Sequence, residues 1–198
     1  MTRQLEIIPI LHTETDLGGL AQTLRDSVGE AAWQARQAAI AEFWQRVRAW
    51  SESLGDDLSG VRVYQDAMPV DPKAEPIQVA GALADRGSAN HQILLDCAQR
   101  GAVLMGTEDP ALLIEEVELA KAEAEGRRDH RHEFKSRRVL ERRDRFIADR
   151  IDATLDAQER AILFLGMFHA VEGMLAADIE ISHPLGTPKG VLGNTRGA

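Results

Sequence analysis

The chain has 198 residues, a formal net charge of −9 and a hydrophobic content of 44%. A chain of this length and composition can bury a core, so global disorder is excluded, and its acidic balance argues against a general affinity for nucleic acid or an anionic membrane. The single cysteine, Cys97, excludes an internal disulfide framework. No apolar stretch reaches the roughly 18 to 20 residues of a membrane span and the N-terminus lacks a signal-peptide pattern, so we expect a cytoplasmic protein with no membrane contact.

Five short apolar runs predict β-strands. In chain order they span residues 5–11, 61–65, 102–105, 161–165 and 179–182. Pro9 lies inside the first run, which indicates an edge strand or a bulge there, because proline cannot donate a hydrogen bond to a sheet.

Helical patterns occupy the segments between these runs. A long N-terminal helical region extends from about Leu17 to Leu54, and we expect a break in it near residues 27–30. Further helices are expected over 77–99 with a flexible point at Gly87–Ser88, from Asp109 and Pro110 to about 126, over 126–158, and over 171–176.

Strands separated by helices predict an α/β fold with a mostly parallel sheet of about four to five strands flanked by helices. We expect a single domain over residues 1–185 and a loosely ordered C-terminal tail over 186–198. The long N-terminal helical region also offers a surface for a homodimer.

Two histidines lie where apolar runs end, and each has an acid close behind it. His12 precedes Glu14, and His169 precedes Glu172. The carboxyl edge of an open parallel sheet is where ligands bind, and imidazole and carboxylate are ligands for divalent cations such as Zn²⁺. Histidine is also the commonest general base near pH 7. We therefore predict a pocket in which His12, Glu14 and His169 act in catalysis or bind a metal.

Each of these two segments also has a simpler interpretation. The H-x-E-x-D spacing of His12, Glu14 and Asp16 places the three side chains on one side only if the segment stays extended. Otherwise the two acids cap the helix that follows. His169 follows Gly166, which permits a bend or a close approach of the backbone, but it could equally bond only to the main chain.

Two more strand ends carry acids. Asp66 follows the second predicted strand and Glu108 the third, so both converge on the same edge if these strands are parallel neighbours. We assign Glu108 to the predicted metal site, and Asp66 to substrate binding together with His91, which faces either the pocket or solvent.

A basic segment stands apart from the acidic average. Ten of the 23 Lys and Arg residues fall between Arg127 and Arg150, a clustering that could bind phosphate or an acidic partner. Acids are interleaved with them, so a solvated helix face, or one that pairs with the acidic helix Glu115–Glu125, is the simpler interpretation. We do not expect nucleic acid as a partner, because no aromatic pattern accompanies the charges.

The two ends of the chain resemble the TraB/PrgY/TIKI group and the related erythromycin-esterase and ChaN-like proteins. These proteins have G-x-x-H motifs near both ends of an α/β core and an Arg-Asp or Arg-Asn element before the second motif. Here Arg143-Asp144 stands upstream of Gly166-Met167-Phe168-His169, and the first motif is Pro9-Ile10-Leu11-His12, with proline in place of glycine. The resemblance implies that His169 is the second motif histidine, that Arg143 is the helix arginine, and that metal-dependent hydrolysis is one activity to expect.

The leading hypothesis is a metal-assisted hydrolase acting on a small-molecule or peptide substrate, with Arg143 anchoring a carboxylate or phosphate of that substrate. A metal-free variant with one histidine as general base stays open. The alternatives are a noncatalytic α/β module that binds a ligand or oligomerises, and a binder of acidic partners through Arg127–Arg150.

Overall fold

A computed structural model describes residues 2–17, 19–73, 75–127 and 129–187. Most of the predicted C-terminal tail lies outside these ranges. Within them the chain forms an α/β fold, as predicted, with one sheet of five parallel strands.

The strands run side by side in the order β3-β2-β4-β1-β5. Their bounds are β1 (Arg3–Ile10), β2 (Val61–Pro69), β3 (Val103–Glu108), β4 (Arg160–Gly166) and β5 (Ile179–Ser182). The second and third strands continue beyond their predicted ends through polar residues. The sequence pattern does not extend the strands over Asp66, Thr107 and Glu108, because these residues are polar although they are buried.

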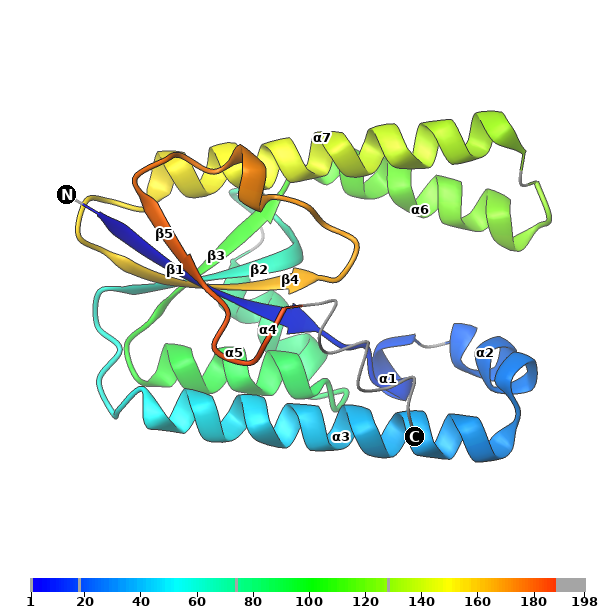
Figure 1. Cartoon of the computed structure of the whole chain (residues 1–198), viewed down its shortest axis with the longest axis horizontal. Coiled ribbons are helices and arrows are strands. Elements are labelled where there is room, and N and C mark those ends of the chain that lie inside the picture. The colour runs from blue at the N-terminus through cyan, green and yellow to red at the C-terminus, as the bar shows by residue number, and fades with distance from the viewer. Residues whose placement is uncertain (1, 18, 74, 128, 188–198) are drawn as a thin grey trace.

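Helices cover both faces of the sheet (Figure 1). One face carries α3 (Glu30–Ser53), α4 (Pro76–Ala84) and α5 (Ala89–Gln99), and the short helices α1 (Glu14–Leu17) and α2 (Leu20–Val28) precede α3 in the chain. The other face carries α6 (Pro110–Ala124), α7 (His130–Thr154) and the 3₁₀ turn η1 (Glu172–Met174), the last being all that forms of the helix expected over 171–176. The predicted break in the N-terminal helical region falls at Gly29, whose φ of 82° ends α2 before α3 begins.

The core is divided by the sheet into two apolar layers. Ile8 and Ile10 of β1 pack with Trp44 of α3, and Leu5 and Ile7 pack with Ile147 of α7. Alternate side chains of a strand point to opposite faces, which explains this division. Trp33 and Trp44 are buried, and Trp44 also donates a hydrogen bond to the carbonyl of Leu11 at 2.8 Å.

The expectation that Pro9 marks an edge strand or a bulge is wrong. β1 lies between β4 and β5 and pairs with β4 in register as far as Gly166. However, β5 pairs with β1 only from Arg3 to Glu6. At Pro9, β1 is therefore paired on one side only, with β4. A proline is tolerated at this position because the pairing between β1 and β5 has already ended.

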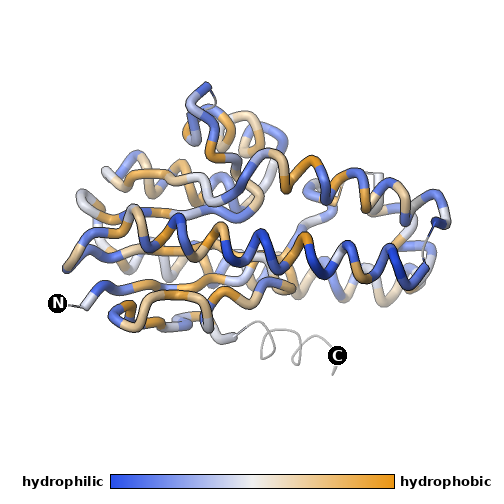
Figure 2. Tube along the Cα trace, turned by 90° about the horizontal axis from the view of Figure 1, so that it is seen from above, coloured by the Kyte–Doolittle hydropathy of each residue, from blue (hydrophilic) through white to orange (hydrophobic). Residues whose placement is uncertain are grey.

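The charged helix α7 pairs with α6, as one interpretation of the sequence predicted. Arg142 reaches Glu115 at 2.7 Å, and the tube of α7 is mainly hydrophilic when seen from above (Figure 2). Phe134, near the N-terminal end of α7, is 52% exposed. None of the described helices is long and apolar enough to cross a membrane.

Candidate functional site

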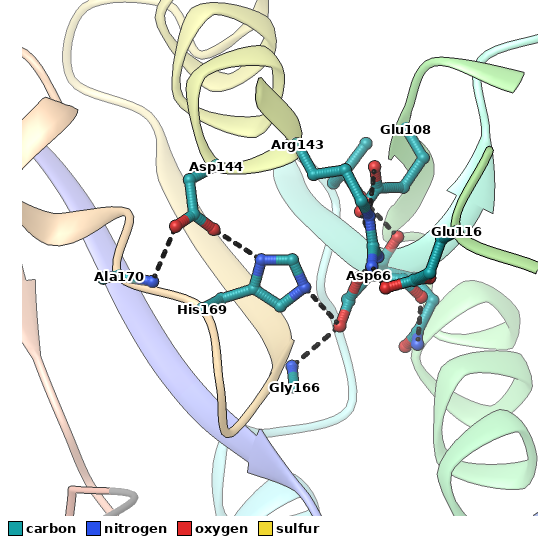
Figure 3. A network of polar contacts seen from close by, with 10 residues as sticks. Asp66, Glu108, Glu116, Arg143, Asp144, Gly166, His169 and Ala170 are labelled. Carbon is teal, nitrogen blue, oxygen red and sulfur yellow. Dashed lines mark hydrogen bonds and ion pairs between the residues drawn. The ribbon is translucent and has the colours of Figure 1, made fainter. Parts of the chain in front are cut away.

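Three polar side chains converge at the carboxyl edge of the sheet. Asp66 lies in β2, Glu108 is the last residue of β3, and His169 follows β4. These strands are neighbours, and one ligand atom from each residue lies within 4.8 Å of the other two. The convergence predicted for these strand ends is therefore present (Figure 3).

A local irregularity of β2 helps to position Asp66. The register between β2 and β3 shifts between Gln65 and Pro69, and Ala67 has a φ of 61°. The hydroxyl of Thr107 in β3 stabilises this region by donating a hydrogen bond to the carbonyl of Gln65 at 2.7 Å. The carboxylate of Asp66 is buried as a result, and a buried carboxylate needs partners.

The end of β4 supplies one of those partners. The backbone N–H of Gly166 donates to Oδ2 of Asp66 at 2.9 Å, and a Cβ on Gly166 would lie 2.6 Å from the same oxygen. Only glycine lets the strand approach this closely. The close approach expected at Gly166 is thus made to a carboxylate of the chain itself.

His169 is held between two carboxylates. Nδ1 of its ring lies 2.5 Å from Oδ1 of Asp144 on α7, and Nε2 lies 3.3 Å from Oδ2 of Asp66. Asp144 is fixed in turn by the backbone N–H of Ala170, which donates to its Oδ2 at 3.1 Å. Burial alone would lower the pKa of His169, but the two carboxylates outweigh it and raise the pKa to about 9. The ring therefore carries a positive charge at neutral pH.

Arg143 bridges the carboxylates on the other side of Asp66. Its Nη2 lies 2.8 Å from Oδ1 of Asp66 and 2.8 Å from Oε1 of Glu108, and its Nε donates to Oε2 of Glu108 at 3.2 Å. Its Nη1 donates to Glu116 of α6. These four bonds use most of the five N–H donors of a guanidinium. The predicted role of Arg143 as an anchor for a substrate anion thus competes with carboxylates of the chain itself.

The two strand-end carboxylates differ in acidity. Burial raises the pKa of Glu108 to about 7, with Arg143 opposing this rise and Asp66 adding to it. Burial would also raise the pKa of Asp66, but the hydrogen bond and charge of His169, together with the charge of Arg143, hold it well below its usual range. At neutral pH the site therefore has one firmly ionised carboxylate beside one that exchanges its proton.

A pocket of about 390 Å³ opens beside this group. Asp66 lines it together with His12 and His91, two of the other predicted site residues. His91 is half-buried, burial lowers its pKa, and its Nδ1 lies 2.9 Å from the hydroxyl of Ser88.

Glu14 is not brought into this pocket. The segment after His12 turns into α1 at Glu14, so the extended alternation that the spacing required is absent, and Glu14 is exposed outside the pocket lining. Asp16 lines the pocket but accepts hydrogen bonds from the backbone and hydroxyl of Thr13, which is the capping role of the simpler interpretation.

Sequence reasoning did not single out Asp144 or Glu116. Asp144 stood among acids assigned to a solvated face, although it is only 4% exposed. Its place beside Arg143 in the Arg-Asp element was the available signal. Glu116 had none, because its role depends on where α6 lies against α7.

Comparison with protein-family models, curated proteins and solved structures finds no match to this chain. The resemblance to the TraB/PrgY/TIKI group stays a prediction, so the geometry of the site is the main basis for assigning a function.

Proposed function

We propose that this chain is a metal-assisted hydrolase whose reacting group is Asp66, Glu108 and His169. The observation that carries the proposal is the line from Asp144 through the ring of His169 to Asp66, with Glu108 within reach of the same point. A carboxylate behind a histidine orients its ring and increases its basicity, as is common for histidines that bind metals. The resemblance to a group with metal-dependent members points the same way.

The donor set fits a divalent cation once the ring of His169 gives up the proton on Nε2, because only the neutral ring can bind a metal. Two ligands on one Zn²⁺ are at most about 4 Å apart, since each bond is about 2.0 to 2.2 Å long. The 3.3 Å between Nε2 of His169 and Oδ2 of Asp66 meets this limit, and the spread of 4.8 Å that includes Glu108 needs a small closure. Four carboxylates surround only Arg143 and His169, so the group has acidic charge to spare; they are Asp66, Glu108, Glu116 and Asp144.

The residues have separable tasks in such a site. A bound cation would lower the pKa of a water molecule toward neutrality. Glu108, whose pKa is raised by burial to about 7, would be suited to exchange a proton beside the cation when it does not itself bind it. Asp144 keeps the ring of His169 in place, and Arg143 holds the two strand-end carboxylates at a fixed separation.

The test is the metal content of protein purified without a histidine tag and reloaded with Zn²⁺ or Mn²⁺. Bound metal should fall below about a tenth of the wild-type level in His169→Ala and Asp66→Asn, and stay at that level in His130→Ala, whose side chain is fully exposed. His12→Ala tests whether the second predicted histidine joins the site. Equal metal content in wild type, His169→Ala and Asp66→Asn contradicts the proposal.

A metal-free hydrolase is the second candidate, favoured by the contacts of Arg143. Because its guanidinium already lies against both Asp66 and Glu108, it offsets part of their negative charge without a cation. In this case hydrolysis of chromogenic ester, amide and phosphate ester substrates would persist in a chelator and be lost in His169→Ala. If hydrolysis is lost in the chelator as well as in His169→Ala, the metal site is supported.

A further inference from the structure

Helix α7 runs along the outside of the molecule, and one of its faces is directed away from α6 (Figure 1). The buried side chains of His132, Val139 and Arg143 mark the face that packs inward. Residues three or four positions apart lie on one side of a helix, so those half a turn away from the buried set form the opposite side. This outer face of α7 consists of exposed residues, namely Arg131, Phe134, Arg137, Arg138, Glu141 and Arg145.

The arginines of the outer face are not neutralised by the chain itself. Within the part of the chain that the structure describes, no hydrogen bond or ion pair joins their guanidinium groups to another side chain. This is unexpected in a chain with a formal net charge of −9, in which carboxylates outnumber basic groups. The outer face therefore carries positive charge that remains available to a partner.

Phe134 adds an apolar contact surface to this charge. It is 52% exposed, and the guanidinium carbons of Arg137 and Arg138 lie 5.8 Å and 5.9 Å from the centre of its ring. Cations at this distance are attracted to the face of the ring, which favours one arrangement of the two long side chains. Aromatic and arginine side chains are the types enriched at protein–protein interfaces.

Acids are confined to one end of the outer face. Asp109, Glu141 and Asp149 line a hollow of about 560 Å³ that Arg138 and Arg145 also line. None of these acids forms an ion pair with the two arginines in the described structure, and Asp109 instead caps the start of α6. The part of the outer face that precedes Glu141 contains no acid, although Glu133 borders it, so the positive charge is concentrated around the aromatic ring.

The inward side of the same helix shows which partner such arginines accept. Arg142 pairs with Glu115 and Arg143 with Glu116, so the acidic helix α6 lies along α7 with its carboxylates against successive arginines. The outer face repeats arginine at helical spacing, but no acidic helix of the described chain covers it.

We propose that the outer face of α7, from Arg131 to Arg138, binds an acidic helix of a partner protein. Arg131 and Arg138 are two turns apart, about 10 Å along the helix axis, so carboxylates two turns apart on the partner would match them. An apolar side chain between those carboxylates would lie on the ring of Phe134. The inference goes beyond the proposed hydrolase and uses none of the residues of the candidate site.

Nucleic acid satisfies this surface less well. A strand of nucleic acid would need a continuous row of cations for its phosphates and several aromatic side chains for its bases. The outer face has one aromatic side chain, and Glu141 interrupts its row of arginines. A short acidic helix needs only the two turns around Phe134.

The test measures, by fluorescence anisotropy, how the full chain binds a labelled helical peptide. The peptide has about 16 residues, with glutamate at every third or fourth position and leucine between, and the matched peptide has glutamine in place of each glutamate. The glutamate peptide should bind at least about tenfold more tightly in dilute salt, because several carboxylate–guanidinium pairs form at once and are little screened. Equal affinity for the two peptides overturns the inference, as does tighter binding of a single-stranded oligothymidylate of the same charge.

Variants assign the binding to the outer face. Changing Arg137 and Arg138 together to glutamine should weaken binding of the glutamate peptide at least about tenfold. Changing Arg46 and Arg48, two exposed arginines of α3, to glutamine removes the same charge and should leave the affinity within about twofold of the wild type.

Phe134→Ala changes no charge and should weaken binding at least about threefold, because the leucines of the peptide lose their apolar contact. Wild-type affinity in Phe134→Ala, or an equal loss in the α3 and α7 double variants, would mean general attraction between charges and overturns the inference. All these positions are exposed, so the fold tolerates the changes. The measurement needs neither metal nor turnover, so its result is independent of the metal test.

Discussion

Two adjacent arginines of α7 have opposite environments, and this contrast allows a matched experiment. The side chain of Arg143 is 4% exposed and bridges Asp66, Glu108 and Glu116, whereas that of Arg142 is 55% exposed and pairs with Glu115. Removing one partner of a buried ion network leaves unpaired charge in a poorly solvated place, while an exposed pair contributes little.

We expect Arg143→Met to lower the free energy of unfolding by about 3 to 5 kcal/mol and Arg142→Met to lower it by less than about 1 kcal/mol. Without Arg143, the carboxylates it bridges repel one another in the interior. Urea denaturation of both variants at one pH is the measurement. Similar losses for the two variants would mean that the bridge does not stabilise the fold.

Residue types alone could place only part of this site. Asp66, Glu108 and His169 were predictable because each follows an apolar run, and parallel strands bring their carboxyl ends to one edge. Arg143 entered through the family resemblance. Its engagement with Glu108 and Glu116 was not predictable, since it depends on how α6 and α7 pack against β3, which short-range patterns do not encode.

At the scale of elements, the site forms where two neighbouring strands are followed by segments that lie on opposite faces of the sheet. β2 continues into α4 and α5 on one face, and β4 continues toward η1 on the other (Figure 1). A crevice opens at such a switch point because the following loops diverge. Asp66 and His169 lie on the two sides of this point, so the fold itself accounts for the place of the site.

The end of β4 can be disturbed there with a single methyl group. A Cβ at position 166 would lie 2.6 Å from Oδ2 of Asp66, so Gly166→Ala must displace that carboxylate from His169. We expect a stability loss of about 1 to 3 kcal/mol and a fall in Zn²⁺ affinity of at least about tenfold. Calorimetric titration with Zn²⁺ measures the second effect. Gly173→Ala is the control, because nothing lies within 4 Å of a Cβ at that position. Unchanged Zn²⁺ affinity in Gly166→Ala would show that Asp66 does not bind the metal.

The sequence patterns identified most elements but not how the polar strand ends continue. The breaks at Gly29 and between α4 and α5 were predictable from glycine positions. The extension of β2 to Pro69 was not, because buried polar residues resemble a loop until their partners are known. The same reason hid the hydrogen bond between Gln65 and Asn90, which joins a strand to a helix 25 residues away.

For the molecule as a whole, the buried charges make stability depend on pH. Glu108 and His169 have pKa values near 7 and 9 in the fold, above their ordinary values of 4.5 and 6.5. The folded state therefore binds these protons more tightly than the unfolded state, and the stability they contribute is lost as pH rises through the folded pKa values. Asp66 has the opposite sign: its pKa is lowered, so its contribution is lost only as pH falls below about 3.8.

These signs predict that the metal-free protein is most stable in weakly acidic solution. Between about pH 6.5 and 9 the contribution of His169 should decline by up to about 3 kcal/mol, in addition to the loss from Glu108 that begins near pH 4.5. Urea denaturation in a chelator at pH 6, 7.5 and 9 measures the decline. In His169→Gln the stability should decline less at the upper end of this pH range, because glutamine has no proton to lose. In the control His130→Gln the decline should match the wild type, since His130 is fully exposed. A wild-type protein equally stable at pH 6 and 9, or an unchanged slope in His169→Gln, would mean that the Asp144–His169–Asp66 line does not hold a proton in the folded state.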